Sequence, residues 1–248
     1  MILIKKIAII FFDLVDTYHQ QKKIINFFLK RNIILKTLFD VGAHKGNYSN
    51  LFLNNYKNLK INLYEPQKKF FKILKKRFSK KKNIKIFNFG ISNKDTRKIF
   101  FINEHDLTSS FSSFDENNLY LKFKAFLFGK NIKGMINKRI FIKTRKLNFC
   151  KNSKKNTKLD LVKIDTEGHE LEVLQGMGKC IYLVKYILIE IHNDKIFKSY
   201  SSKHVHNYLI KKNFILQERF KFPFTKWEDR IYLNKKHEHS RASSKRNS

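Results

Sequence analysis

Short apolar runs that end in a carboxylate recur along the chain. Four such runs end at Asp40, Glu65, Asp165 and Glu190. Apolar and β-branched runs of this length are typical of buried parallel strands. Because ligands of open α/β sheets bind beyond the carboxyl ends of the strands, we expect the four acids to mark a ligand-binding edge.

Helical patterns alternate with these runs, each with an apolar stripe along one side. Alternation of strands and helices at this spacing predicts βαβ units and a parallel sheet. The expected helices cover 45–56, 68–78, 170–177 and 203–212, and the further strands cover 85–91, 214–220 and 230–233.

The length of 248 residues corresponds to one domain with small additions. We expect a helical N-terminal extension over 1–36, the α/β domain over 37–234 and a disordered polar tail over 235–248. Within the domain, 97–145 is predicted as an inserted segment, with a β-hairpin or loop in 97–114 and a basic insertion at 121–139.

The apolar run at residues 7–12 is too short to span a membrane, and no small-residue cleavage site follows it. Cys150 and Cys180 are too few and too distant in sequence for a disulfide scaffold or a zinc knuckle. We therefore expect a reduced, cytoplasmic protein, with peripheral contact at the inner membrane face as the remaining alternative.

Charge is the outlying feature of the composition. Lys and Arg number 53 against 20 Asp and Glu, a net charge of +33, and the excess is concentrated in the acid-free stretches 66–94 and 117–159. Such a balance indicates an anionic partner: nucleic acid, acidic polysaccharide or a membrane surface. The abundance of Lys, Asn, Ile and Phe is also what AT-rich coding produces, so part of the charge has a compositional explanation.

A glycine-rich turn, Asp40-Val41-Gly42-Ala43-His44-Lys45-Gly46, ends the first run and opens a helix. Glycines there let backbone amides approach a ligand. The turn lacks both the Gly-Lys-Ser/Thr of a P-loop and the G-x-G-x-x-G of a dinucleotide site, which favours a nucleoside ligand without phosphate. Glu65, 19 residues after Gly46, is suited to hold ribose hydroxyls.

A second constellation, Lys163-Ile164-Asp165-Thr166-Glu167-Gly168-His169-Glu170, ends the third run. Asp165 and Glu167 are candidates for sharing a proton, binding a cation or accepting a substrate proton. The alternative is that acids here stabilise a helix N-terminus, which fits Glu170 better. In the next strand His192 shares a face with Glu190, as a base, a substrate contact or simply a buried histidine.

Four stretches together resemble the FkbM family of S-adenosyl-L-methionine-dependent methyltransferases: 39–49, 64–66, 161–176 and 189–192. The resemblance implies a class I methyltransferase fold, a Rossmann-like three-layer α/β sandwich with a seven-stranded mixed sheet and helices on both faces. It also implies O-methylation, often of sugar hydroxyls in glycans or natural products.

The resemblance also assigns roles by position. Asp40, Gly42, Ala43 and Gly46 would line the methionine end of the cofactor, Glu65 its ribose and Ser92 its adenine, and Ser109 and Ser110 match a serine pair of the family. His44 departs from the usual Asn, and Leu147-Asn148 from the usual Leu-Asp.

The function that follows is methyl transfer to a sugar hydroxyl of a glycan, glycolipid or other small acceptor. Asp165, Glu167 and His192 are the candidates for the catalytic base, and a divalent cation held by Asp165 and Glu167 is the alternative. One rival is an RNA ribose methyltransferase, favoured by the charge; the chain has only Pro66 and Pro223, so the Asn/Asp-Pro-Pro-Tyr/Phe motif of base-amine methylation is absent. The other is a non-enzymatic basic binding module.

Overall fold

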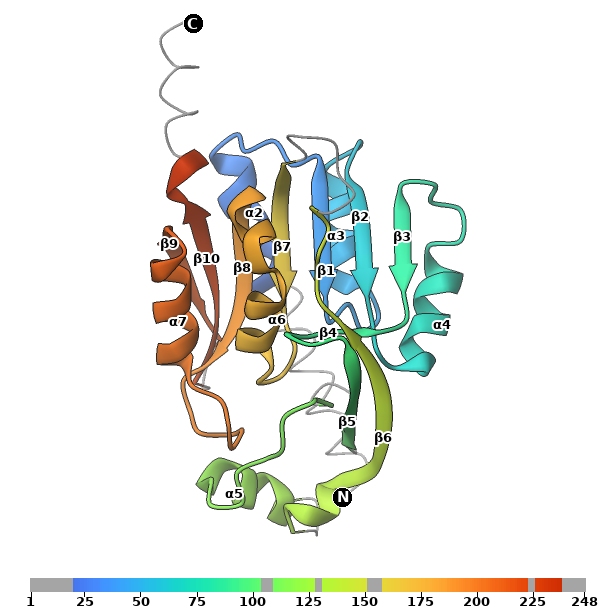
Figure 1. Cartoon of the computed structure of the whole chain (residues 1–248), viewed down its shortest axis with the longest axis vertical. Helices are drawn as coiled ribbons and strands as arrows, with labels where there is room; N and C mark the ends of the chain where they lie inside the picture. Colours follow the sequence, from blue (N-terminus) through green and yellow to red (C-terminus); the bar gives the residue numbers. More distant parts are fainter. Residues whose placement is uncertain (1–19, 104–108, 128–130, 151–157, 223–225, 238–248) are drawn as a thin grey trace, which may run out of the picture.

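A seven-stranded mixed sheet forms the centre of the protein, as seen in the computed structural model in Figure 1. The structure describes residues 20–103, 109–127, 131–150, 158–222 and 226–237. The strand order is β3-β2-β1-β7-β8-β10-β9, with every neighbouring pair parallel except those that involve β10. The strands are β1 (Thr37–Val41), β2 (Lys60–Tyr64), β3 (Ile84–Phe87), β7 (Leu159–Ile164), β8 (Val184–His192), β9 (Phe214–Lys221) and β10 (Trp227–Asn234).

The chain reverses its direction of travel across the sheet between β1 and β7, which lie side by side. Strands on either side of such a switch point send their connections to opposite faces, leaving a crevice at the carboxyl ends. The apolar runs predicted from the sequence lie in β1, β2, β7 and β8. Asp40 and Glu190 lie near the carboxyl ends of β1 and β8, and Glu65 and Asp165 directly follow β2 and β7, so the four acids do gather along this edge.

Helices cover both faces of the sheet and make it the middle of three layers. Neighbouring residues of β7 show this: Leu161 packs in one apolar cluster with α2, α3 and α4, and Val162 in a second cluster with α6 and α7. In Figure 1 α6 and α7 lie in front of the sheet. The helices are α2 (Lys22–Lys30), α3 (Asn47–Asn55), α4 (Lys68–Arg77), α6 (Glu170–Gly176) and α7 (Ser202–Lys211). The class I methyltransferase fold implied by the resemblance is therefore confirmed.

Strands between residues 90 and 145, which include most of the segment predicted as inserted, form a second, three-stranded sheet of order β4-β6-β5, which extends below the main sheet in Figure 1. Its strands are β4 (Gly90–Ile91), β5 (Thr96–Asn103) and β6 (Ile136–Arg145), with α5 (Leu119–Leu127) and the 3₁₀ turn η3 (Lys133–Met135) between β5 and β6. The predicted strand 85–91 is thus two strands in different sheets.

The prediction of a β-hairpin or loop within 97–114 is confirmed only in part, because β5 pairs along its length with β6. Only an isolated bridge between Phe101 and Ser110 joins the two parts of that segment. The predicted basic insertion at 121–139 covers all but the first two residues of α5 and the beginning of β6. Further along β6, buried Ile142 and Thr144 alternate with exposed Phe141 and Lys143, a two-residue period that the many lysines obscure in the sequence.

Cys150 and Cys180 form a disulfide with Cα atoms 5.5 Å apart, so the expectation of two reduced thiols is wrong. The two cysteines are 30 residues apart in sequence but close in space. The chain leaves Cys150 along β7 and returns along α6, which runs in the opposite direction. There the 3₁₀ helix η4 (Gly178–Leu183) meets the loop before β7, and Leu147 N–H donates to the Gly176 carbonyl at 3.1 Å.

Two predictions concern the ends of the chain: the disordered C-terminal tail and the apolar run near the N-terminus. Residues 235–237, predicted to be disordered, form a 3₁₀ helix (η5, Lys235–His237), and the rest of the predicted tail lies outside the described residues, as do residues 1–19 with the apolar run 7–12. Among the described residues, no helix has the length and apolar character needed to cross a membrane.

Candidate active site

The glycine turn lies between β1 and α3 and touches the end of β7. Gly42 has φ +83°, and a Cβ atom on it would lie 1.8 Å from the backbone oxygen of Asp165. Only glycine fits at this position, which brings the turn directly against the second constellation. The N–H groups of Gly42 and Ala43 both donate to the carbonyl of Tyr64 at the end of β2, at 3.0 and 3.2 Å. The glycine therefore serves the packing of the turn against Asp165, and these two amides are bonded within the protein.

Glu65 follows β2 and is buried, with 3% of its surface exposed. One carboxylate oxygen accepts the N–H of His44 and the other the N–H of Gln67, both at 2.8 Å. Burial raises the pKa of Glu65 to about 7, although these two amide bonds pull the pKa down. Each carboxylate oxygen has a second lone pair, so Glu65 holds the turn and keeps acceptor capacity for a ligand.

Lys163 is a buried cation between two acids. Its Nζ lies 3.0 Å from Asp165 and 3.5 Å from Asp40, and Asp40 also accepts the hydroxyl of Ser49 at 2.6 Å. Burial alone would lower the pKa of Lys163, but the two carboxylates raise it above its ordinary value. Burial tends to raise the pKa of Asp165, and Lys163 overcomes this and lowers it. Asp165 is consequently ionised and weakly basic.

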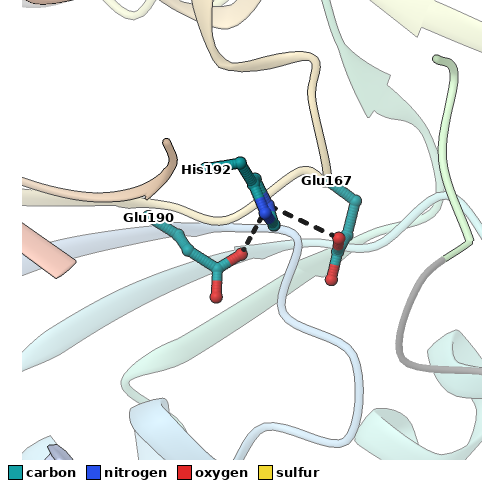
Figure 2. A group of neighbouring side chains, drawn as sticks. All are labelled: Glu167, Glu190 and His192. Carbon is teal, nitrogen blue, oxygen red and sulfur yellow. Dashed lines mark ion pairs between the residues drawn. The ribbon is translucent and has the colours of Figure 1, made fainter. Parts of the chain in front are cut away.

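Glu167, Glu190 and His192 form the acidic cluster (Figure 2). His192 Nε2 lies 3.2 Å from a carboxylate oxygen of Glu190 and 3.6 Å from one of Glu167. Glu190 and His192 share a face of β8, as predicted, and Glu167 reaches them from the turn after β7, where its φ is +54°. Burial and the charge of Glu190 raise the pKa of Glu167 well above its ordinary value, and burial and the charge of Asp165 do the same for Glu190.

Glu170 has a structural role. Its Oε1 accepts the backbone N–H of Thr166 at 3.0 Å and of Gly168 at 3.2 Å, together with the Thr166 hydroxyl. It closes the turn that holds Glu167 at the start of α6, in agreement with the interpretation of Glu170 as a helix N-terminal acid.

The remaining predicted residues are also engaged within the protein. Ser92 follows β4, is fully buried, and its hydroxyl lies 3.0 Å from His169 Nε2 and accepts Lys98 Nζ at 3.2 Å. The hydroxyl of Ser110 donates to the Glu167 carbonyl, and the hydroxyl of Ser109 accepts the N–H of Asn103 at 3.1 Å. The segment with the serine pair is thereby joined to the turn that carries Glu167.

Two features of the site were not predicted. The sequence assigns Lys163 no role beyond its place near Asp165, yet a lysine inside an apolar strand is a signal of a buried ion pair. The sequence places Glu190 beside His192 but outside the catalytic set, and it predicts the cation site from Asp165 and Glu167. Among the described residues, the group with metal-binding geometry joins Glu167 to Glu190 and His192, while Asp165 is bound to Lys163.

Comparison with known proteins gives one extensive match and several distant ones. The family described as Methyltransferase FkbM domain matches residues 40–216. A hexuronic acid methyltransferase, AglP, from Haloferax volcanii is 51% identical over 35 residues, which span 14% of this chain and 15% of that protein.

Two solved structures resemble the chain at low identity. One is a SAM-dependent methyltransferase from Aquifex aeolicus, with TM-score 0.46 and 13% identity over 89% of this chain and 93% of that chain. The other is M. capricolum TrmK in complex with S-adenosylhomocysteine, with TM-score 0.44 and 15% identity over 82% of this chain and 65% of that chain.

Proposed function

The chain belongs to the FkbM family of S-adenosylmethionine-dependent methyltransferases, and we propose that it methylates a hydroxyl group of a sugar in a glycan or glycoconjugate. The observation that carries the proposal is the acidic cluster of Glu167, Glu190 and His192, which lies at the carboxyl edge of the sheet next to the glycine turn. A hydroxyl acceptor needs a proton acceptor close to the methyl donor, and this cluster supplies one.

In the proposed complex the cofactor lies along the ends of β1 and β2. The turn from Gly42 to Gly46, with Asp40 beneath it, lines the methionine end; Glu65 accepts the ribose hydroxyls; Ser92 lies near the adenine. The methyl group then points toward the end of β7, because Gly42 lies against Asp165.

The reaction is an in-line displacement. The acceptor oxygen forms a bond to the methyl carbon, the sulfur–carbon bond breaks, and its electron pair returns to sulfur, giving the thioether S-adenosylhomocysteine. Of the three predicted base candidates, Asp165 is held in its ionised form by Lys163, and His192 is 2% exposed. Glu167 has a partly exposed side chain and a raised pKa, so we assign it the hydroxyl proton.

The acceptor class is supported by two observations. The short match to a hexuronic acid methyltransferase points to an acidic sugar, and the net charge of +33 favours an acceptor with negative charge. To test the proposal, we would incubate the purified protein with S-adenosylmethionine and a panel of neutral and uronic acid glycans, and measure S-adenosylhomocysteine release. Release with a uronic acid glycan and one added methyl group in its mass spectrum are expected. Absence of S-adenosylmethionine binding in calorimetry at millimolar ligand would refute the proposal.

The second candidate is RNA ribose methylation, favoured by the acid-free basic stretches 66–94 and 117–159. It predicts RNA binding that weakens steeply with salt, because each phosphate contact releases counterions. Methyl transfer to RNA, with every glycan left unmodified, would decide for this candidate.

A further inference from the structure

Three ligand atoms from two different strand ends converge in the acidic cluster. They are one oxygen each of Glu167 and Glu190 and the Nε2 of His192, all within 4.8 Å of one another. Figure 2 shows the three side chains pointing to a common position. Glu167 comes from the turn after β7, so the convergence results from the tertiary fold and not from one local motif.

The spacing of these atoms suits a divalent cation. In octahedral coordination at about 2.1 Å, adjacent ligand atoms lie about 3.0 Å apart and opposite ones about 4.2 Å. The Nε2 to oxygen distances of 3.2 Å to Glu190 and 3.6 Å to Glu167 fall within this range. A cation therefore fits with little movement of the three side chains.

The imidazole of His192 is the independent sign of a ligand. It is 2% exposed, and neither ring nitrogen makes a hydrogen bond among the described residues, although Nε2 lies 3.2 Å from the buried Oε2 of Glu190, which makes none either. Buried polar groups are normally hydrogen-bonded, and each exception calls for an explanation. A cation between Nε2 and the carboxylates would give both that nitrogen and the Glu190 oxygen a partner.

Three aromatic rings hold this imidazole in position. Phe197, Tyr200 and Trp227 contact it edge-on, with centroid distances of 5.3, 5.9 and 5.6 Å. The ring is thus fixed with Nε2 toward the two carboxylates before any ligand arrives, and preorganised ligands bind metal ions better than mobile ones.

The cluster also lacks a lysine or arginine partner among the described residues. Neither Glu167 nor Glu190 has an ion pair with lysine or arginine within the described parts of the chain, although the chain carries a net charge of +33. The buried lysine nearby, Lys163, is bound to Asp40 and Asp165.

We propose that Glu167, Glu190 and His192 form a binding site for a divalent first-row cation. Two carboxylates and one imidazole are a mixed oxygen and nitrogen set, which suits Mn²⁺ and its neighbours better than Ca²⁺. The proposal rests on the proposed function in one respect: the role of the cation is to bind the acceptor hydroxyl and lower its pKa. Because the cation would lower the pKa of the hydroxyl, a weak base would suffice, and the oxygen of Glu167 that does not bind the cation would accept the proton.

The test measures cation binding directly, without methyl transfer. Mn²⁺ is titrated into the full chain and followed by electron paramagnetic resonance, and S-adenosylmethionine binding is measured on the same preparation. One Mn²⁺ per chain is expected. Glu167→Gln, Glu190→Gln and His192→Gln should each weaken Mn²⁺ binding by about tenfold or more. Glu218→Gln, which removes an acid on β9 outside the cluster, should bind Mn²⁺ as the unmodified chain does.

Two results would overturn the cation site: no saturable Mn²⁺ binding at millimolar concentration, or equal binding by all variants. If His192→Gln does not fold, Glu167→Gln decides, because its side chain is 17% exposed and its replacement keeps the volume. Retained S-adenosylmethionine binding with no Mn²⁺ site refutes the cation alone. Mn²⁺ binding without S-adenosylmethionine binding refutes the proposed function and leaves the cation site.

Discussion

Replacing Glu65 with glutamine tests the predicted cofactor site. The carboxylate already accepts two backbone amides at 2.8 Å, and the proposed complex adds the ribose hydroxyls. A hydrogen bond to a charged group contributes about 1.5–3 kcal/mol. Glutamine keeps one acceptor oxygen and loses the charge, so S-adenosylmethionine should lose one charge-assisted hydrogen bond from its ribose. At about 1.4 kcal/mol per tenfold, the dissociation constant of S-adenosylmethionine should rise about 10- to 150-fold.

The pH dependence sharpens this experiment. The pKa of Glu65 is about 7, and hydroxyl donors prefer the ionised form, so affinity in the unmodified protein should increase as the pH rises through 7. In Glu65→Gln the affinity for S-adenosylmethionine should not show this increase with pH. Calorimetry at about pH 6 and about pH 8 measures both effects, with Glu218→Gln as the charge-matched control. Affinities that agree within about twofold at the higher pH, with melting temperatures unchanged, would refute the assignment of Glu65 to the ribose.

Three further predictions concern the framework of the site. Gly42→Ala places a Cβ atom 1.8 Å from the Asp165 carbonyl, so the melting temperature and S-adenosylmethionine binding should both fall; an unchanged melting curve would contradict the tight turn. Lys163→Met leaves Asp40 and Asp165 without their cation and should lower the free energy of unfolding in urea by about 3–5 kcal/mol, whereas a loss below about 1 kcal/mol would count against the buried pair. For Glu65 the folded pKa is raised, so its contribution to stability is full below about pH 4.5 and is lost as the pH rises through 7. The stability of Glu65→Gln relative to the unmodified chain should therefore increase by up to about 3 kcal/mol from pH 5 to 8 in urea titrations, and a constant difference would contradict the raised pKa.

The central strands of the main sheet were predictable because most of their residues are buried. β1, β2, β7 and β8 appear in the sequence as short, mainly apolar runs, and a carboxylate directly after each run marks the edge where ligands bind. The pairing of Glu190 and His192 also followed from the sequence, since residues two apart on a strand share a face.

The second sheet and the partners of individual acids were harder to predict from the sequence. β6 pairs with β5 across more than 30 positions of intervening chain, and a two-residue period is easily hidden when its exposed positions are lysines. Asp165 and Glu167 are two residues apart, yet the positive φ of Glu167 sends the two side chains to different partners. Local spacing could not show that reversal, nor could it show that Cys150 meets Cys180 at the end of α6.

The chain carries a positive net charge, whereas the side chains proposed to act on the acceptor are acidic. The two features act at different distances and on different steps. Electrostatic potential from exposed lysines extends over about a Debye length and acts on the approach of a partner, whereas proton transfer depends on groups within hydrogen-bond reach. The +33 charge therefore bears on which acceptors reach the protein, and supports an anionic one. The few acids near the crevice differ in their partners: Asp40 and Asp165 share the positive charge of Lys163, and Glu167 and Glu190 lie beside His192. A lysine beside Glu167 would take up these carboxylates in an ion pair, so the separation leaves them open to the proposed cation and to the acceptor hydroxyl.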